Sequence, residues 1–405
     1  MNLSGSAPGM LDRAAFDAGA ATVDPALIET MRARVRVRDV ALLMYTSGTT
    51  ARPKGCLLTH EALTRQAENV ARTRFLLGPS DAFWDPLPLF HCGGIVPMLG
   101  CFSAGATFCH AGHFDPTEAL HTIVEERCTV LYPAFETIWR AVIDHPDFPA
   151  ADLSAVRLVQ NIATPERLAQ FEEAMPQAVQ VTSYGSTECA TNLTLPLPDD
   201  PAEIRLHTLG RPMNGMEIKI VDPETGDELG EDAMGELCFR GYARFDGYYK
   251  DPEQTAATID TDGWFHSGDR AMLVGGGNLV YGGRIKDMLK VGGENVAAIE
   301  VEDFLARHPA IALVQIVGAP DARYQEVAVA YVQLTPGASL THEEIVEFCR
   351  GAIASYKIPR YLRLVTDWPL SGTKIKKVVL REWIADELAG DGVTEAPRIG
   401  GRAGR

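Results

Sequence analysis

One short stretch combines residue types that suit the binding of a phosphate group. It is the run Tyr45–Gly55, which reads YTSGTTARPKG. Glycines let the backbone approach an anion closely, hydroxyls and backbone N–H groups donate hydrogen bonds to it, and Lys54 supplies positive charge. The stretch contains no G-x-x-x-x-G-K-[ST] pattern, so it is not a Walker loop. We therefore predict a phosphate-binding loop of another class, and a plain Ser/Thr/Gly surface loop is the alternative.

A strand and a helix are expected to hold this stretch in place. Val40–Met44 is short, continuous and apolar, which predicts a buried strand. After the stretch, Thr59 opens a pattern of three- and four-residue spacing that predicts a helix. The residues that recur at this spacing are Leu63, Ala67, Val70 and Arg74. The phosphate-binding loop is predicted to connect the strand directly to the helix.

A second cluster, Tyr184–Glu188, reads YGSTE and follows the strand-like segment Ala178–Thr182. An aromatic ring can stack on a nucleotide base, a threonine hydroxyl can reach a phosphate, and a carboxylate can hold Mg²⁺. The alternative is a turn at a strand end with a solvated glutamate. Because the cluster follows a candidate phosphate loop, we favour nucleotide binding.

Composition excludes several classes of partner. Lys and Arg number 37 against 54 Asp and Glu, a net charge of −17, so nucleic acid is not an expected partner. The eight cysteines form no C-x-x-C pair and are interpreted as reduced. We find no candidate membrane span and no signal-peptide pattern, which predicts a cytoplasmic protein without integral membrane association. A small-molecule carboxylate is the expected partner, and a homo-oligomer is left open.

In order and spacing, these motifs resemble the adenylate-forming superfamily: acyl-CoA synthetases, adenylation domains and beetle luciferases. The resemblance runs from about Val23 to Leu388 and implies an α/β fold, with a multi-layer large domain and a small C-terminal α+β cap. Only 44 residues precede Tyr45, where the family normally carries most of a subdomain, so we expect an N-terminally truncated large domain. The expected division is 1–22 disordered, 23–285 partial large domain, 286–388 cap and 389–405 disordered tail.

The resemblance also implies roles for individual residues. The implied ATP- or AMP-binding residues are Thr46, Ser47, Gly48, Thr49, Thr50, Lys54, Asn161, Ala163, Tyr184, Gly185, Asp269 and Arg284. The implied catalytic residues are Lys374, Glu188 and Thr187, with Mg²⁺ held by Glu188 and by Thr49 as a second ligand. Lys286 falls at the hinge, while Gly292, Gly293 and Glu294 fall on the loop that faces CoA. His91 and Gly93 resemble the acyl-pocket motif.

The chain departs from the family pattern in several places, and these leave alternatives open. Ala51 and Ile162 stand where glycine is usual, and Thr373 precedes Lys374 in a loop one residue short. Lys376 or Lys377 could therefore take the role of Lys374, or all three could lie on a solvated face. Two further alternatives concern other implied residues: Asp269 and Arg284 could form a surface ion pair, and His91 could be a hydrogen-bonded core histidine.

The implied reaction has two steps. A carboxylic acid, expected to be fatty or otherwise hydrophobic, attacks Mg·ATP to give acyl-AMP and pyrophosphate, and CoA then displaces AMP. The cofactors and co-substrates are thus ATP, Mg²⁺ and CoA. The alternatives are an adenylating enzyme that loads a carrier protein, a luciferase-like oxygenase, or a non-catalytic remnant that still binds nucleotide.

The C-terminal part of the chain carries clear secondary-structure patterns. Apolar runs predict three strands, and a capping box of Thr341 and Glu344 predicts a helix from His342. The predicted strands are Leu313–Val317, Val327–Leu334 and Tyr361–Val365. The run Gly275–Gly277 is predicted to be a hairpin turn, since no helical pattern follows it.

Overall fold

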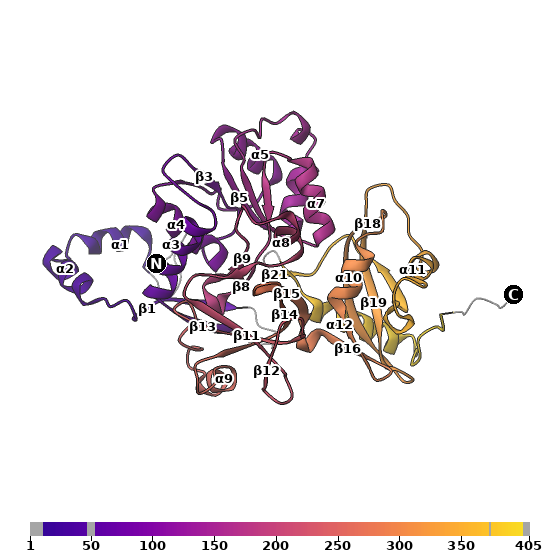
Figure 1. Ribbon diagram of the computed structural model, residues 1–405. Coiled ribbons are helices and arrows are strands. Elements are labelled where there is room, and N and C mark those ends of the chain that lie inside the picture. Colours follow the sequence, from indigo (N-terminus) through magenta and orange to yellow (C-terminus); the bar gives the residue numbers. More distant parts are fainter. Residues whose placement is uncertain (1–10, 47–52, 372–373, 400–405) are drawn as a thin grey trace.

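Buried apolar segments of the chain gather into a large domain and a small C-terminal cap that lies beside it (Figure 1). The structure is a computed structural model and describes residues 11–46, 53–371 and 374–399. The predicted α/β fold with a small α+β cap is confirmed. One apolar cluster fills the large domain from Met44 to Leu279, and the clusters of the cap begin at Leu289. We keep the proposed boundary between residues 285 and 286.

A parallel sheet forms one layer of the large domain, with strand order β4-β3-β5-β6-β7. Its strands are mostly buried, as expected for a sheet covered by helices on both faces. The strands are β3 (Ala82–Trp84), β4 (Thr107–Cys109), β5 (Val130–Phe135), β6 (Leu158–Ile162) and β7 (Val179–Val181). The connections between them contain α4 (Cys92–Ala104), α5 (Pro116–Glu125), α6 (Glu136–Ile143), the short η1 (Phe148–Ala150) and α7 (Pro165–Ala174).

Two antiparallel sheets complete the large domain, in the orders β10-β9-β8 and β12-β11-β13-β14-β15. The first contains β8 (Tyr184–Ser186), β9 (Thr191–Leu195) and β10 (Arg211–Pro212), with η2 (Thr187–Cys189) and α8 (Ala202–His207) in its connections. The second contains β11 (Met216–Val221), β12 (Glu228–Leu229), β13 (Gly235–Gly241), β14 (Phe265–Val274) and β15 (Asn278–Arg284), with α9 (Pro252–Thr258) between β13 and β14. The turn predicted at Gly275–Gly277 is confirmed between β14 and β15.

The elements around the predicted phosphate loop differ from prediction. β1 (Val40–Thr46) pairs antiparallel with β2 (Lys54–Thr59), and α3 (His60–Thr73) follows. The loop thus joins two strands, and the prediction that it leads directly into a helix is wrong. β1 is also more exposed than predicted, since Met44 is its one buried residue. Thr59 does open the helix: its hydroxyl accepts a hydrogen bond from Ala62 N at 3.1 Å.

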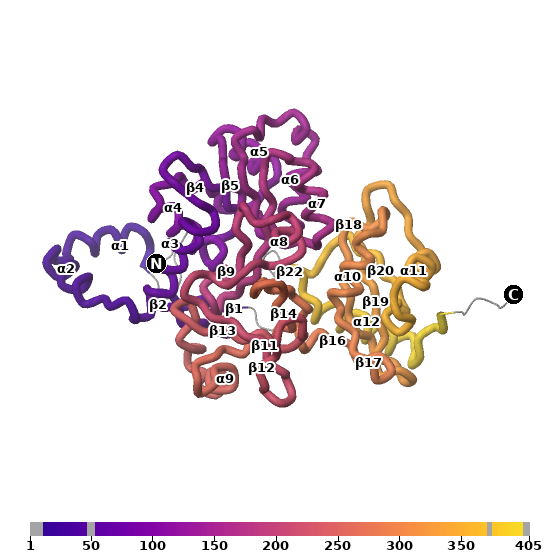
Figure 2. Tube along the Cα trace, viewed as in Figure 1, coloured from indigo at the N-terminus to yellow at the C-terminus, as the bar shows by residue number. Residues whose placement is uncertain are grey.

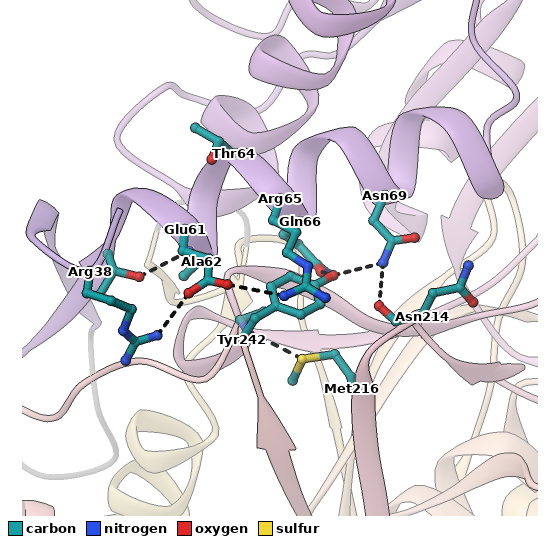
Figure 3. A network of polar contacts seen from close by, with 12 residues as sticks. Arg38, Glu61, Ala62, Thr64, Arg65, Gln66, Asn69, Asn214, Met216 and Tyr242 are labelled. Atoms are coloured by element: carbon teal, nitrogen blue, oxygen red, sulfur yellow. Dashed lines mark hydrogen bonds and ion pairs between the residues drawn. The ribbon is translucent and has the colours of Figure 1, made fainter. Parts of the chain in front are cut away.

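Polar contacts fix α3 against the antiparallel sheets (Figure 3). Tyr242 Oη donates to Gln66 Oε1 at 2.6 Å, and Asn69 Nδ2 donates to Tyr242 Oη at 2.8 Å. Gln66 also donates to the carbonyl oxygen of Asn192 in β9. The apolar side of the helix is buried, as the spacing predicted. These contacts orient the hairpin that directly precedes α3.

Residues 11–46 begin with two helices, α1 (Arg13–Ala20) and α2 (Pro25–Arg34), which contain no buried residue. They extend away from the body of the large domain (Figure 2). The prediction that residues 1–22 are disordered is wrong for residues 13–20, because α1 forms there. Asp12 caps this helix by accepting a hydrogen bond from Ala15 N at 2.7 Å.

The cap is a mixed sheet with helices on both faces. Its order is β17-β16-β19-β18, with β20 parallel to β19. The strands are β16 (Met288–Val291), β17 (Glu294–Ala297), β18 (Ile311–Asp321), β19 (Gln325–Leu334) and β20 (Tyr361–Leu364). The remaining elements are η3 (Ile285–Asp287), α10 (Ala298–Leu305), α11 (His342–Cys349), η4 (Ser355–Lys357), the hairpin β21 (Leu370–Ser371) and β22 (Lys374–Ile375), and α12 (Lys377–Gly390). The three predicted strands and the Thr341–Glu344 capping box are confirmed.

The chain beyond α12 packs on the cap. Ala396 N donates to Asp321 Oδ2 at 2.6 Å, and Ala322 N donates to the carbonyl oxygen of Thr394 at 2.8 Å. Ala396 is itself buried. The prediction of a disordered tail from residue 389 is therefore wrong for residues 389–399.

Contacts from α7 and α10 join the large domain to the cap. Arg307 Nη2 lies 2.8 Å from Glu166 Oε1 in an ion pair. Arg167 Nη2 donates to the carbonyl oxygen of Ile311 at 3.1 Å, and its Nε lies 3.3 Å from Glu136 Oε1. This polar junction holds the cap in the orientation that Figure 1 shows.

A pH dependence of stability is expected from Asp303 at this junction. Burial, followed by the charges of Glu302 and Glu166, raises the pKa of Asp303 to about 7, although Arg307 opposes the shift. Glu136 adds a further negative charge. The folded chain therefore keeps a proton that the unfolded chain loses near pH 3.8, so the stability contributed by Asp303 falls as the pH rises between these values.

We expect Asp303→Asn to raise the free energy of unfolding by about 1–3 kcal/mol above pH 7, because the amide stays neutral. The difference from the parent chain should shrink as the pH falls toward 3.8. Urea unfolding of both chains, from pH 3.8 to above pH 7, measures this difference in the free energy of unfolding. A pH-independent difference would contradict the assignment.

Candidate active site

Three strands bring an aromatic ring, a carboxylate and a guanidinium together. Tyr184 Oη in β8 donates to Asp269 Oδ2 in β14 at 2.6 Å. Arg284 Nε, at the end of β15, lies 3.3 Å from Asp269 Oδ1. The Tyr184 ring lies 6.1 Å from that of Tyr281. The sequence singled out Tyr184, Asp269 and Arg284 in three separate motifs, and the structure brings them into one group.

The Asp269 carboxylate is suited to a ligand that donates hydrogen bonds. Its side chain is buried, and Oδ1 accepts no hydrogen bond from the described residues, although Arg284 lies beside it. Burial raises the pKa of Asp269, and the Arg284 charge opposes this shift. A pair of ribose hydroxyls would supply the missing donors. In the Asp269–Arg284 pair the carboxylate is buried, while the guanidinium is exposed.

A second group gathers around Glu188. Tyr248 Oη donates to Glu188 Oε1 at 3.1 Å, and Lys54 Nζ lies 5.1 Å from the centre of the Tyr248 ring. Burial, and then the Glu188 charge, raises the pKa of Tyr248, so its phenol stays protonated. A carboxylate and an ammonium group that both contact Tyr248, on the loop side of the β1–β2 hairpin, suit a phosphate chain with its cation. Mg²⁺ at a phosphate site is usually bound by one or two protein carboxylates, while phosphates and waters fill its other coordination positions. Glu188 would supply such a carboxylate.

Gly185 lies where the chain passes close to itself. A Cβ at this position would lie 1.9 Å from the Thr191 carbonyl oxygen. Ala190 and Thr191 have φ values of 52° and 97°, and this left-handed turn folds β9 back onto β8. Glycine at 185 thus meets a packing requirement of the β8–β9 connection, which carries Thr187 and Glu188.

We expect Gly185→Ala to cost about 1–3 kcal/mol of stability, because the backbone must shift to admit the methyl group. Urea unfolding measures this loss, and Glu188-dependent activity per folded molecule should fall with it. Gly230→Ala is the matched control, since a Cβ on the exposed Gly230 meets nothing within 4 Å. Equal stability of both variants would contradict the close approach.

Asn161 and Ala163 lie at the end of β6 and in the connection to α7. Asn161 is fully buried, and neither polar atom of its side chain has a hydrogen-bond partner among the described residues. Such an amide requires water or a ligand. The neighbouring Gln160 donates to Ser183 Oγ at 2.7 Å, which links β6 to the segment before Tyr184. Adenine contact by Asn161 and Ala163 stays a prediction.

His91 caps α4. Its Nδ1 accepts a hydrogen bond from Gly93 N at 2.9 Å. A Cβ on Gly93 would lie 2.5 Å from Leu87 Cδ1, so a larger residue there would displace the end of the Leu87 side chain. These contacts give His91 and Gly93 a structural role, and their place in an acyl pocket stays a prediction.

Several implied residues lie on the cap or outside the described ranges. Lys286 is in η3, and burial, followed by the Arg284 charge, lowers its pKa. Gly292 and Gly293 form the turn between β16 and β17, where φ is 60° and 91°, and Glu294 begins β17. Lys374 begins β22, and its side chain lies outside the described residues, as do Ser47, Gly48, Thr49 and Thr50.

Lys377 is one of the alternatives to Lys374 as the catalytic lysine, and its side chain has a partner within the cap. Lys377 Nζ lies 2.6 Å from Glu302 Oε1, and Glu302 is buried. The same Glu302 oxygen accepts a hydrogen bond from Ile316 N at 2.6 Å. Lys377 is thus engaged within the cap, and the assignment of the catalytic lysine to Lys374 stays a prediction.

Family models match most of this architecture. The model described as AMP-binding enzyme matches residues 6–249, and the one described as AMP-binding enzyme C-terminal domain matches residues 300–374. The chain belongs to the AMP-binding enzyme family. Family members thus share both the domain that carries the Tyr184 and Glu188 groups and the cap.

Named relatives agree with this placement. The chain is 39% identical over 368 residues to YngI of Bacillus subtilis, which carries a provisional acyl-CoA synthetase name; the match covers 90% of this chain and 67% of YngI. It is 34% identical over 361 residues to the mitochondrial medium-chain acyl-CoA ligase ACSF2 of Rattus norvegicus, covering 86% of this chain and 58% of the relative. The chain thus spans less than two thirds of the rat relative.

Solved structures agree on the fold. The ATP-bound crystal structure of MatB from Rhodopseudomonas palustris matches with a TM-score of 0.79 and 27% identity, covering 87% of this chain and 69% of MatB. No helix within the described ranges combines the length and the apolar character needed to cross a membrane.

The sequence missed two aromatic residues of the site. Tyr248 lies between Lys54 and Glu188, and Tyr281 lies beside Tyr184. Neither role has a local signal, because each depends on a strand pairing: β2 meets Tyr248 through an isolated bridge from Cys56, and β15 pairs with β14.

Proposed function

We propose that this chain activates a carboxylic acid with ATP to form acyl-AMP and pyrophosphate, and then transfers the acyl group to CoA with release of AMP. The observation that carries the proposal is the buried Asp269 carboxylate with one oxygen left without a hydrogen bond, held between Tyr184 and Arg284. It lies in a chain that belongs to the AMP-binding enzyme family.

The physical task of the first step is to bring two anions together. In the proposal, the hydroxyl-rich loop and Lys54 hold the β- and γ-phosphates, while Thr187 and Lys374 meet the α-phosphate. Glu188 would hold Mg²⁺, which when bound neutralises charge on the phosphates. A general base is not needed, because the attacking carboxylate is already ionised near neutral pH.

The second step requires a different group at the same centre. We propose that the cap rotates about Lys286, which withdraws Lys374 and brings the turn at Gly292–Gly293 to the acyl-AMP. Glycines there would let the narrow thiol-bearing arm of CoA pass close to the backbone.

The substrate class is proposed to be a fatty or otherwise hydrophobic acid. The rat relative's name as a medium-chain acyl-CoA ligase supports this choice. We propose a cytoplasmic setting, because all eight cysteines lie in described ranges, are buried and form no disulfide. An enzyme that loads a carrier protein is the competing function.

Acid-dependent release of pyrophosphate from Mg·ATP tests the proposal. The chain is assayed with short, medium, long and aromatic acids, with and without CoA. Release that rises with one acid, and turns over only with CoA, is the expected result. Turnover with a phosphopantetheinylated carrier protein but not with CoA would favour the competing function. A folded sample that binds ATP and releases no pyrophosphate with any acid would contradict the proposal.

A further inference from the structure

The strand that carries Asp269 is irregular on both sides. Against β13, Glu236 pairs with Arg270 and Cys238 pairs with His266, so residues 267–269 stand opposite Leu237 alone. Against β15, the register also shifts between Asp269 and Ala271. A bulge of this kind turns a side chain away from the regular pleat and leaves backbone N–H groups without ladder partners. Asp269 therefore depends on other contacts for its direction.

A single carboxylate spans this bulge. Glu236 Oε1 accepts a hydrogen bond from Gly268 N at 2.9 Å, and Glu236 Oε2 lies 2.9 Å from His266 Nδ1. Gly268, which directly precedes Asp269, has a φ of 70°, so this N–H is held in a left-handed turn. Glu236 thus contacts both ends of the bulge: Gly268, which directly precedes Asp269, and His266.

Ser267 makes two further hydrogen bonds at the bulge, one to β13 and one within β14. Ser267 Oγ donates to the Leu237 carbonyl oxygen at 2.6 Å, and Asp269 N donates to Ser267 Oγ at 3.1 Å. Through Ser267, the backbone N–H of Asp269 is thus linked to β13, the strand that also carries Glu236. The backbone on the N-terminal side of the Asp269 Cα is thereby held by hydrogen bonds within the protein.

His266 is held on its other side as well. Its Nε2 lies 3.5 Å from Asp260 Oδ2, and Asp260 Oδ1 accepts hydrogen bonds from Asp262 N at 2.9 Å and Trp264 N at 2.8 Å. The imidazole ring thus lies between two carboxylates that are both anchored to backbone. This arrangement limits the movement of Glu236 across the bulge.

We propose that Glu236 is a positioning residue that aims Asp269 at the ribose of the bound nucleotide, through its bonds to Gly268 N and His266. The inference rests on the proposed function, in which Asp269 accepts the ribose hydroxyls. Glu236 itself touches neither ATP nor the acid. A carboxylate that is already held in place loses less conformational entropy on ligand binding than a mobile one would.

A competing interpretation of the same side chains is a metal centre. Glu236, Cys238 and His266 offer an oxygen, a sulfur and a nitrogen atom that all lie within 4.8 Å of one another. The hydrogen bond from Gly268 and the placement of His266 between two carboxylates account for these groups without an ion. Metal content is therefore measured in the test.

The test compares the affinities of ATP and 2′,3′-dideoxy-ATP by calorimetry for the parent chain, Glu236→Ala and Glu236→Gln. The parent is expected to prefer ATP, and Glu236→Ala to lose about tenfold in ATP affinity while its dideoxy-ATP affinity stays nearly unchanged. Glu236→Gln keeps an oxygen for Gly268 N and is expected to recover most of the preference. In an Asp269→Ala background, Glu236→Ala should have no further effect on ATP affinity.

Glu217→Ala is the matched control, because Glu217 on the neighbouring strand β11 pairs with Arg240 and not with the bulge. It should leave the preference for ATP unchanged. A Glu236→Ala chain that melts lower but keeps the parent's preference would overturn the positioning role and leave the proposed function standing. Stoichiometric zinc in the parent, lost from Glu236→Ala, would also overturn it. A parent that binds both nucleotides equally would remove the ribose role of Asp269, and with it that of Glu236.

Discussion

Replacing Lys374 with alanine is expected to slow acyl-AMP formation by about 10²- to 10³-fold, the loss typical when one preorganised donor to developing charge is removed. The ammonium group is proposed to meet the charge that grows on the α-phosphate, and no neighbouring lysine is expected to reach the same point. The thioester-forming step should be spared, because the cap is proposed to carry Lys374 away before CoA attacks. Pyrophosphate release in a single turnover measures the first step, and chemically made acyl-AMP with CoA measures the second.

Two further lysine variants serve as controls for Lys374→Ala. Lys377→Ala should lower stability, because it leaves the buried Glu302 without its cation, and should leave acyl-AMP formation per folded molecule intact. Lys376→Ala should change neither quantity by much. Unchanged pyrophosphate release in the Lys374 variant would contradict the assignment and move the role to Lys376 or Lys377.

Predictions from sequence succeeded where the pattern was local and the element was long. Strands β18 and β19 are continuous apolar runs bounded by turns, so their existence could be predicted without knowing their partners. The helix from His342 has its own capping box, in which Thr341 N donates to Glu344 Oε2 at 2.8 Å. In both cases, the residues that decide the structure are neighbours in the chain.

Prediction failed where a partner outside the segment itself decides the structure. Strand β2 contains only Lys54–Thr59, and its partner β1 lies across the predicted loop, so the loop chemistry hid the hairpin. The segment after α12 is rich in Gly and Ala, but Asp321 and Ala322 bond to it from far earlier in the chain. Short segments with little hydrophobic pattern take their structure from such contacts.

The candidate site divides in the same way. The resemblance to the adenylate-forming superfamily singled out Asp269 and Arg284, whereas Tyr184 also follows a recognisable strand-like segment. The resemblance could not provide the register shifts that turn Asp269 out of the regular pleat, nor the support from Glu236, since both depend on how β13, β14 and β15 pair. Residues within a recognisable motif are thus easier to single out than the residues on other strands that contact them.

Asp269→Ala is expected to weaken ATP binding by about 10- to 100-fold, the equivalent of about 1.5–3 kcal/mol for hydrogen bonds to a charged acceptor. The proposed ribose hydroxyls would lose their acceptor, and the buried Tyr184 hydroxyl and Arg284 would lose theirs. The KM for ATP should rise far more than kcat falls, since the ribose is remote from the reacting phosphorus. Tyr184→Phe keeps the ring and removes one bond to Asp269, so a smaller loss is expected.

Asp262→Ala is the matched control for Asp269→Ala, because Asp262 is an exposed carboxylate in the turn that precedes β14. It should bind ATP as the parent does. Since Asp269 is buried, the melting temperature of each variant must be measured beside its ATP affinity, so that loss of fold is separated from loss of contact. A folded Asp269→Ala chain with the parent's affinity for ATP would contradict the ribose assignment. The Tyr184–Asp269–Arg284 group would then be a structural link between β8, β14 and β15, and the nucleotide would have to bind elsewhere.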